Sequence, residues 1–283
     1  MVGLFRLTGK LLALLPEASL EPLARLAAVL TFDLLRLRRR IILGNLQIAF
    51  GNERDQAELI RLGRASVVHF FLTFLEFFRS VSVDIARDIV VQGRHHLDEA
   101  LGEGRGAYVL CCHLGNWEAM GAGFTRDLCP ARVLVKKVGS GSFNRFVEEV
   151  RDHNGFLWVR RREKGDGYRE IRRVLEQGEV VGFVIDQARP GEPRLPFFGE
   201  PAKTNTSLAA IRGKIPAPVV PSFIVRRRPG HHTLYVLPAL DLKTTGDGEK
   251  DILAHSQIFN EVVESMVRRY PEQYFWMHNR WKA

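Results

Sequence analysis

A histidine and a glutamate stand in the run His113-Leu-Gly-Asn-Trp-Glu118, with four residues between them. An imidazole removes a proton from a hydroxyl group near neutral pH, and a neighbouring carboxylate fixes its tautomer and raises its basicity. On a continuous helix these two positions would lie roughly 140° apart around the axis, too far to share a face. The pattern therefore predicts that His113 lies in a turn and that Glu118, in the first helical turn, folds back to orient the imidazole.

The residues between the pair favour the same geometry. Gly115 permits a tight turn, and the free N–H groups of a helix starting at Asn116 are expected to hold a developing oxyanion. This is the arrangement of a base that activates an acceptor hydroxyl for attack on a thioester, with no Ser or Cys nucleophile. A purely structural His–Glu pair fits the spacing equally well. No third ligand stands at a recognisable spacing for zinc, and the sequence predicts neither a metal nor a cofactor.

Three further residues are candidates for the same site. Asp186 and Gln187 follow the uniformly apolar run 180–185, which predicts a buried parallel strand. Ligands of open α/β sheets bind beyond the carboxyl ends of the strands, which is also where His113 is expected. Arg151 falls on a predicted helix. The structural alternatives are a strand-end turn for Asp186 and a solvated face for Arg151.

Other polar clusters are given structural interpretations. The run Arg160-Arg-Arg-Glu-Lys164 is expected to be solvated or to meet phosphates. His95-His96 and His231-His232 are predicted to lie in loops. The adjacent Cys111 and Cys112 are predicted to be strand core, with one side chain on each face.

The elements that must position these residues alternate along the chain. Strands are predicted at 107–112, 133–135, 156–159, 180–185, 218–226 and 233–237, and helices at 116–124, 143–153, 168–177, 206–212 and 251–270. Such alternation predicts an α/β fold with an open mixed, mostly parallel sheet flanked by helices.

Residues 1–40 are predicted to form two amphipathic helices that associate with a membrane, ahead of a domain spanning 41–283. Arg6 and Lys10 interrupt the first apolar pattern, and the basic run Arg36-Leu-Arg-Arg-Arg40 ends the second. A spanning helix needs about 20 consecutive apolar residues, which no run here reaches. A basic amphipathic segment on a membrane surface fits the pattern. Two ordinary helices packed on the domain fit it equally.

A stripe of apolar residues follows helical spacing within 66–79. It predicts a helix that contributes to the core or lines a groove for an acyl chain. The stripe consists of Val67, Phe70, Phe71, Phe74, Phe77 and Phe78.

Composition narrows the class of protein. The 283 residues are 46% hydrophobic and 26% charged, which excludes wholesale disorder. A formal net charge of +9 favours binding to nucleic acid, to anionic lipid or to an acidic protein. Since no helix-turn-helix or RNA-binding signature is present, nucleic acid is disfavoured. Three cysteines, two of them adjacent, form a poor disulfide framework and indicate a reducing compartment.

The chain resembles the bacterial lipid A biosynthesis acyltransferases, which are lysophospholipid acyltransferase-like enzymes. Many glycerolipid acyltransferases share the His-x4-acid pattern, whereas its combination with the C-terminal Trp-x-His-x-Arg-Trp pattern is specific. The stretches that carry the resemblance are 40–50, 113–118, 186–187 with 196–204, and 271–281.

The resemblance implies an enzyme on the cytoplasmic face of the bacterial inner membrane. It would move a fatty acyl chain from acyl carrier protein, or less often coenzyme A, to a hydroxyl of a lipid A precursor. His113 and Glu118 match the catalytic pair of the family, and Arg151 and Asp186 fall where it has further essential residues. Gly115, Asn116 and Gln187 are expected to contact substrate beside them.

Two alternatives stay open at this stage. The first is an acyltransferase of the same fold that uses a different glycolipid, aminolipid or polyene acceptor. The second is a non-catalytic protein whose basic surface binds a membrane or nucleic acid.

Overall fold

A seven-stranded mixed sheet organises the described part of the chain, in the order β1-β9-β8-β2-β5-β3-β4. The computed structural model describes residues 1–134, 141–159, 166–187 and 190–282. Among the described strand pairs of this sheet, only β8–β9 is antiparallel, so β1 and β9 run against the other five strands. The strands are β1 Ile89–Gln92, β2 Ala107–Cys111, β3 Ala131–Leu134, β4 Leu157–Val159, β5 Val180–Val184, β8 Val219–Arg228 and β9 His231–Val236.

The central strands are apolar because helices cover both faces of the sheet. Every residue of β2 is buried. Its Val109 stands opposite Gly182 of β5 on one side and Val220 of β8 on the other. Successive side chains of β2 alternate between two core clusters, one on each face.

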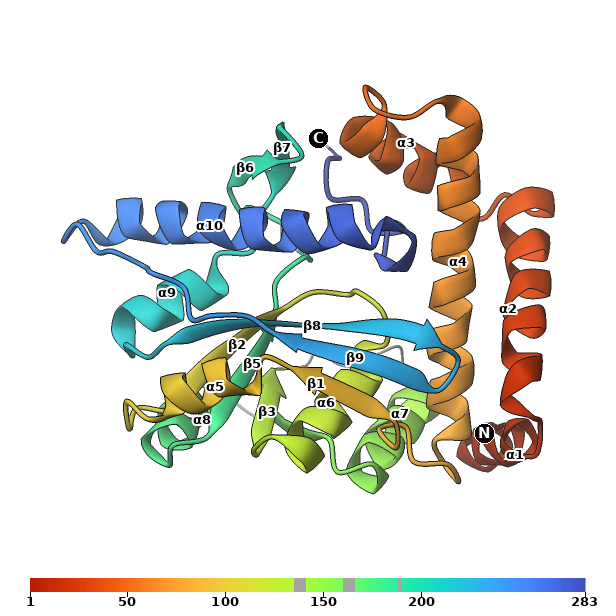
Figure 1. The fold of residues 1–283 in the computed structure, drawn as a ribbon, viewed down its shortest axis with the longest axis horizontal. Helices are drawn as coiled ribbons and strands as arrows, with labels where there is room; N and C mark the ends of the chain where they lie inside the picture. The colour runs from red at the N-terminus through yellow and green to blue at the C-terminus, as the bar shows by residue number, and fades with distance from the viewer. Residues whose placement is uncertain (135–140, 160–165, 188–189, 283) are drawn as a thin grey trace.

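Helices α8, α9 and α10 contribute to the core on one face of the sheet, and α5, α6 and α7 to the core on the other. Figure 1 shows α10 stretched along the sheet and α4 standing across its end. These helices are α4 Gln56–Arg79, α5 Arg94–Leu101, α6 Trp117–Asp127, α7 Gly141–His153, α8 Asp166–Glu176, α9 Ser207–Lys214 and α10 Gly248–Arg269.

The first fifty residues form three helices that pack on α4, namely α1 Val2–Ala13, α2 Leu20–Ala28 and α3 Arg39–Phe50. A π-helical segment, Val29–Leu34, continues α2. Leu20, Ala24 and Phe32 belong to the same buried cluster as Trp276 near the C-terminus. The segment 20–32 therefore contributes to the main core. Within the described residues, no helix combines the length and apolar character that crossing a bilayer requires.

The predicted α/β fold class is confirmed, with a mixed and mostly parallel sheet between helices. The elements that were not predicted are strand β1, helices α3 and α5, the part of α4 before residue 66, and the antiparallel hairpin of β6 Arg194–Phe197 and β7 Glu200–Lys203. The three strands among them have four residues each, and α5 has eight. In the edge strand β1, Val90 is exposed.

The loop prediction for the two histidine pairs is wrong. His95 and His96 lie on α5, and His231 and His232 begin β9. His232 is fully buried. Its N–H donates to Asp88 O, and the residue stands opposite Arg226 in the β8–β9 pair. The prediction for the cysteines is confirmed, since Cys111 and Cys112 lie in the two opposite core clusters.

Candidate active site

His113 and Asp186 lie side by side at the carboxyl ends of two neighbouring parallel strands. His113 Nδ1 is 2.7 Å from Asp186 Oδ1, and the main-chain N–H of His113 donates to Asp186 Oδ2 at 3.0 Å. The sheet register explains this meeting, because Cys111 at the end of β2 stands opposite Val184 at the end of β5. His113 and Asp186 each lie two residues beyond these strand ends, so the imidazole and the carboxylate meet.

The pair changes the proton affinity of both groups. Burial alone lowers the pKa of His113, but the charge of Asp186 and its hydrogen bond outweigh burial and raise that pKa above its usual 6.5. Burial raises the pKa of Asp186, and the neighbouring His113 reverses this and lowers it. Asp186 is therefore ionised at neutral pH, and His113 is a stronger base than a free imidazole.

Asp186, and not Glu118 as predicted, is the hydrogen-bond partner of His113 Nδ1, although the charge of Glu118 also contributes to the raised pKa of His113. The Glu118 carboxylate accepts two hydrogen bonds from Arg151, at 2.8 Å from Nε and 2.6 Å from Nη2. Arg151 comes from α7 and is only 8% exposed, so the solvated alternative for this residue is also wrong. The planar guanidinium of Arg151 binds the Glu118 carboxylate bidentately and fixes this side chain of α6. The imidazole is hydrogen-bonded to Asp186 instead.

The turn behind His113 is built from Gly115 and Asn116. Gly115 has φ +62°, and a Cβ there would lie 2.3 Å from Ile224 O, so only glycine fits. Asn116 caps α6, because its Oδ1 accepts from the N–H groups of Glu118 and Ala119. The N–H groups of Glu118 and Ala119 are therefore not free to hold an oxyanion. Neither Gly115 nor Asn116 is among the described residues that line the adjoining cavity.

A cavity of about 820 Å³ opens beside His113. Glu118, Arg151 and Gln187 also line it, whereas most of its wall is apolar and comes from both faces of the sheet. Its aromatic lining is Phe70, Phe74, Phe77, Trp117, Phe124, Phe143, Phe156, Tyr168, Phe183 and Phe275. The dimensions and lining are those of a site for a largely apolar ligand.

The phenylalanine stripe on α4 contributes to the core and also lines the cavity. Phe70, Phe74 and Phe77 line the cavity, whereas Val67 and Phe77 are buried in the two core clusters. Phe70 lies 5.5 Å from Phe275, ring centre to ring centre. The stripe is therefore a core helix whose phenylalanines continue into the cavity wall.

Two aromatic rings flank the imidazole. The centre of the His113 ring is 5.0 Å from that of Trp117 and 5.8 Å from that of Phe275. The N–H of Phe275 also donates to His113 O at 3.1 Å. Neither residue was a predicted site residue, although Phe275 lies inside the C-terminal stretch that carries the resemblance.

The C-terminal stretch joins distant parts of the chain around the site. Asn45 Nδ2 donates to the carbonyls of Trp276 and His278, each at 2.8 Å. Arg280 O accepts from Lys203 N at 3.1 Å, and the Arg280 guanidinium stacks 3.8 Å from the Phe197 ring centre. The stretches that carry the resemblance are therefore neighbours in space, which no spacing in the sequence indicates.

Of the three cysteines, Cys111 lies two residues before His113 and lines the cavity. Burial is the main cause that raises the pKa of this thiol, and the nearby Asp186 raises it further. The thiolate is therefore disfavoured. Among the described residues, no group of three or more His, Cys, Asp or Glu side chains is placed to hold a metal. The predicted basic run 160–164 lies outside the described residues.

Comparison with known proteins gives consistent matches. A family model described as bacterial lipid A biosynthesis acyltransferase matches residues 3–283. The chain is 26% identical over 197 residues to the lipid A biosynthesis palmitoleoyltransferase of Escherichia coli K12. It is equally similar to the lipid A biosynthesis acyltransferase of Shigella flexneri. Each alignment covers 68% of this chain, and the chain spans 61% of the length of these relatives.

Proposed function

Because the chain belongs to the bacterial lipid A biosynthesis acyltransferase family, we propose that it transfers a fatty acyl chain from a thioester to a hydroxyl of a lipid acceptor. The observation that carries the proposal is the His113–Asp186 pair, of which His113 lines a cavity with mostly apolar walls. Such a cavity suits the hydrocarbon chain, and the pair supplies the base.

In the proposed reaction, Asp186 holds His113 in the tautomer that carries its proton on Nδ1. Nε2 then accepts the proton of the acceptor hydroxyl while the hydroxyl oxygen attacks the thioester carbonyl. Collapse of the tetrahedral adduct breaks the carbon–sulfur bond, and the imidazolium returns the proton to the departing thiolate. The products are an ester and a free thiol, and no residue of the protein is acylated.

The ion pair of Glu118 and Arg151 has a different role in this scheme. Both residues line the cavity, and their side chains are only 11% and 9% exposed. We assign them to shaping the site and placing the reacting groups, since their mutual hydrogen bonds hold α6 against α7 beside His113. Gln187 adds a polar group to the same wall.

Acyl carrier protein is the proposed donor and a lipid A precursor the proposed acceptor. A net charge of +9 favours both, because the carrier protein is acidic and the lipid precursor carries phosphates. The names of the two relatives support a lipid A acceptor for this chain.

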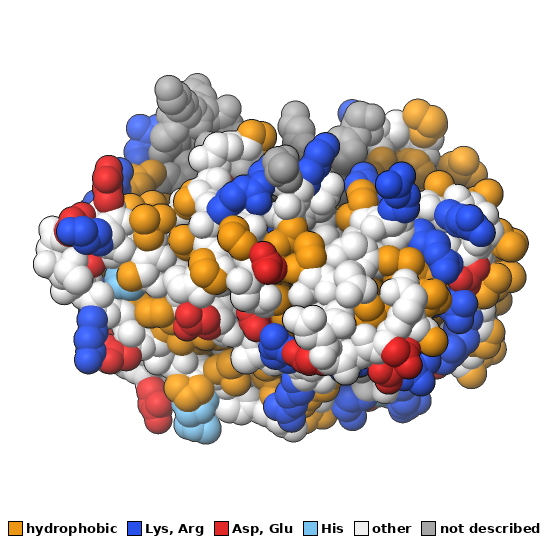
Figure 2. All heavy atoms as spheres, turned by 90° about the horizontal axis from the view of Figure 1, so that it is seen from above, with side chains coloured by type: hydrophobic (Ala, Val, Ile, Leu, Met, Phe, Trp, Pro, Cys, Tyr) orange, Lys and Arg blue, Asp and Glu red, His pale blue; other side chains and the backbone are white. Residues whose placement is uncertain are grey.

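Residues 1–40 are proposed to rest on the cytoplasmic face of the inner membrane, ahead of a catalytic domain formed by 41–283. Large apolar side chains are exposed on and after α1 and α2, with the exposed Arg36, Arg38 and Arg40 close by in sequence. The apolar set is Leu4, Leu7, Leu11, Leu14, Leu23, Leu26, Val29, Leu30, Leu34 and Leu35. Figure 2 shows hydrophobic and basic side chains intermingled at the end formed by the N-terminal helices, a composition that suits an anionic bilayer.

Membrane binding is tested by flotation with vesicles of phosphatidylethanolamine and phosphatidylglycerol. The double variant Leu26→Glu, Leu30→Glu should lose most vesicle binding, whereas Leu253→Glu, at an exposed leucine of α10, should retain it. Equal binding by all three proteins would contradict the assignment of this surface.

Acyl transfer is tested by mass spectrometry with purified protein. Acyl carrier protein and coenzyme A donors are each offered with a lipid A precursor, a glycolipid, an aminolipid and an aryl polyene as acceptors. The proposal expects an acylated lipid A precursor with the wild type and none with His113→Ala of the same thermal stability. Transfer to one of the other acceptors instead, or undiminished transfer by the variant, would refute it.

A further inference from the structure

A buried ion pair lies directly behind the catalytic turn and takes no part in the scheme above. Glu76 on α4 and Arg226 on β8 are 6% and 4% exposed. Arg226 donates to the Glu76 carboxylate from Nε at 3.0 Å and 3.2 Å and from Nη2 at 2.7 Å. Burial by itself raises the pKa of Glu76, but Arg226 and His232 outweigh it and hold the carboxyl ionised.

The carboxylate of Glu76 also reaches the turn that follows His113. Oε2 accepts from Asn116 Nδ2 at 2.7 Å, and the other end of that amide caps α6 through the N–H groups of Glu118 and Ala119. Asn116 is completely buried, so its amide has one orientation in which both ends are bonded. Glu76 thereby selects the orientation in which Oδ1 faces the start of α6.

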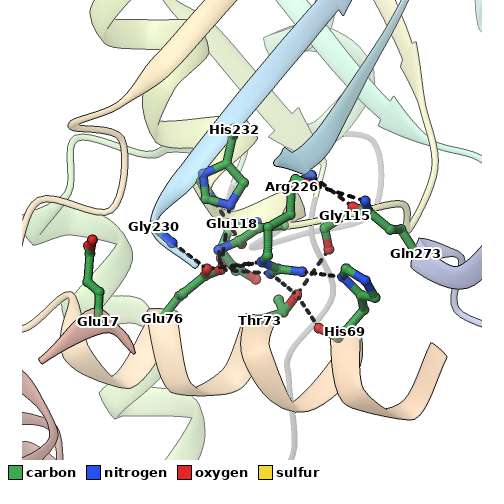
Figure 3. Close-up of polar contacts among 12 residues, drawn as sticks. Glu17, His69, Thr73, Glu76, Gly115, Glu118, Arg226, Gly230, His232 and Gln273 are labelled. Carbon is green, nitrogen blue, oxygen red and sulfur yellow. Dashed lines mark hydrogen bonds and ion pairs between the residues drawn. The ribbon is translucent and has the colours of Figure 1, made fainter. Parts of the chain in front are cut away.

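Thr73, one turn earlier on α4, holds the other side of the same turn. Its hydroxyl lies 3.0 Å from Gly115 O and 3.1 Å from His69 O, and it accepts from Arg226 Nη2 at 3.0 Å. Figure 3 shows Thr73 and Glu76 projecting from α4 toward Arg226, with Gly115 close to Thr73. The turn is thus bonded at two successive residues to one rigid helix.

The two neighbouring histidines, His69 and His232, add no charge to the Glu76–Arg226 pair. Burial, followed by the charge of Arg226, lowers the pKa of His69 to about 3, so its neutral Nδ1 accepts from Arg226 Nη1 at 2.9 Å. Burial also lowers the pKa of His232, whose Nε2 is 3.5 Å from Glu76 Oε2. Gly230 N donates to Glu76 Oε1 and attaches the β8–β9 turn to the same carboxylate.

Fold stability alone does not account for a buried ion pair at this position. A buried pair recovers little net free energy after desolvation, and apolar residues of similar size often replace one without loss. What an apolar pair cannot do is bond the Asn116 amide and the Thr73 hydroxyl. We propose that Thr73, Glu76 and Arg226 are positioning residues that fix the Gly115–Asn116 turn and so place His113 relative to Glu118.

The inference rests on the proposed acyl transfer. One of the two measurements that test it, hydrogen exchange, does not depend on that activity. The variants are Glu76→Gln, which removes the charge, and Thr73→Val, which removes only the hydroxyl and retains the shape. Leu62→Ala is the control, because Leu62 is buried on the same helix away from the turn. Thermal denaturation first establishes how much stability each variant loses.

With wild type, the two variants and the control, kcat and KM are measured for the thioester donor. Glu76→Gln and Thr73→Val should lower kcat by about 10- to 100-fold with KM nearly unchanged, because the reacting groups are displaced while the cavity remains. Leu62→Ala should keep the wild-type kcat. A separate variant, Thr73→Ser, retains a hydroxyl at this position and should therefore retain most of the wild-type kcat, in contrast to Thr73→Val.

Hydrogen exchange of the peptide covering 113–120 is the readout that needs no substrate. It should quicken in both variants and remain unchanged in Leu62→Ala. Wild-type exchange in this peptide together with a kcat loss no greater than that of the control would overturn the inference. Absence of transfer by the wild type with any donor would instead refute the proposed function, and quickened exchange in the variants would still support the positioning of the turn.

Discussion

His113 and Asp186, 73 residues apart, share two hydrogen bonds, one from the imidazole Nδ1 and one from the main-chain N–H of His113. The second bond matters because it ties the carboxylate to the backbone of the turn as well as to the ring. Asp186 therefore cannot rotate away without breaking both contacts. The imidazole is held in one orientation with one tautomer, which is the condition for an efficient general base.

Asp186→Asn should reduce acyl transfer and shift its dependence on pH. An asparagine can present an amide to Nδ1 but cannot stabilise the imidazolium, so kcat should fall by about two to four orders of magnitude. His113 acts as a base only when neutral, so activity falls as pH drops through its pKa. Since Asp186 raises that pKa above the usual 6.5, its removal should move the acidic limb of the pH–rate profile to lower pH.

The measurement is kcat across the range from pH 5 to 9 for wild type and Asp186→Asn. Asp88→Asn is the control, because Asp88 pairs with a histidine outside the cavity, His231. A variant at Asp186 whose acidic limb stays at the wild-type position would contradict the role assigned to the carboxylate.

Arg151→Met should destabilise the protein as well as inactivate it. The change leaves the Glu118 carboxylate buried without its bidentate partner, which costs about 3–5 kcal/mol in the free energy of unfolding. Arg6→Met is the matched control: Arg6 also pairs with a glutamate, Glu149, but its side chain is 56% exposed. That loss should be about 1 kcal/mol or less. Urea denaturation of both variants measures the difference, and equal losses would show that burial of the Glu118–Arg151 pair has no energetic weight.

Much of the site was predictable from local sequence, and the remainder depends on which strands become neighbours. The apolar runs before His113 and Asp186 indicated two parallel strands ending at one edge, and both residues lie there. Their direct pairing was not predictable, because the positions of the strands along the sequence do not indicate that β2 and β5 are neighbours in the sheet. Glu118 was assigned to the imidazole on sequence proximity, and α7 instead brings Arg151 to it.

The buried support of the turn illustrates the same limit. Glu76 and Arg226 are 150 residues apart. Glu76 lies in an otherwise apolar helical pattern, and Arg226 begins the run of three arginines that follows an apolar strand, so neither pattern indicates the other as its partner. The short elements β1 and α5 went unpredicted because few residues of either are buried. Tertiary packing therefore decided both the partners of the charged groups and the existence of the weakest elements.

Cys111→Ala should retain most of the acyl transfer activity. The thiol lines the cavity, but burial raises its pKa, so it carries no charge at neutral pH and is a poor nucleophile. A turnover number within a few-fold of wild type, measured with the same donor and acceptor, is the expected result. Complete loss of activity, or an acyl group covalently attached at Cys111 in intact-protein mass spectrometry, would show that the reaction passes through an acyl-enzyme.

Gly121→Ala should shorten the acyl chain that the protein prefers. Gly121 lines the cavity on α6, and a Cβ built there lies only 1.8 Å from Cε2 of Phe156, another lining residue. The ring of Phe156 must therefore move, and we expect it to occupy space that the end of a long chain would use. Gly44→Ala is the control, since a Cβ at that helical glycine meets no atom within 4 Å. Competition between acyl donors of 10 to 16 carbons, with products separated by mass spectrometry, should give shorter products with Gly121→Ala and wild-type products with Gly44→Ala. An unchanged product distribution in a stably folded Gly121→Ala protein would place the end of the acyl chain elsewhere in the cavity.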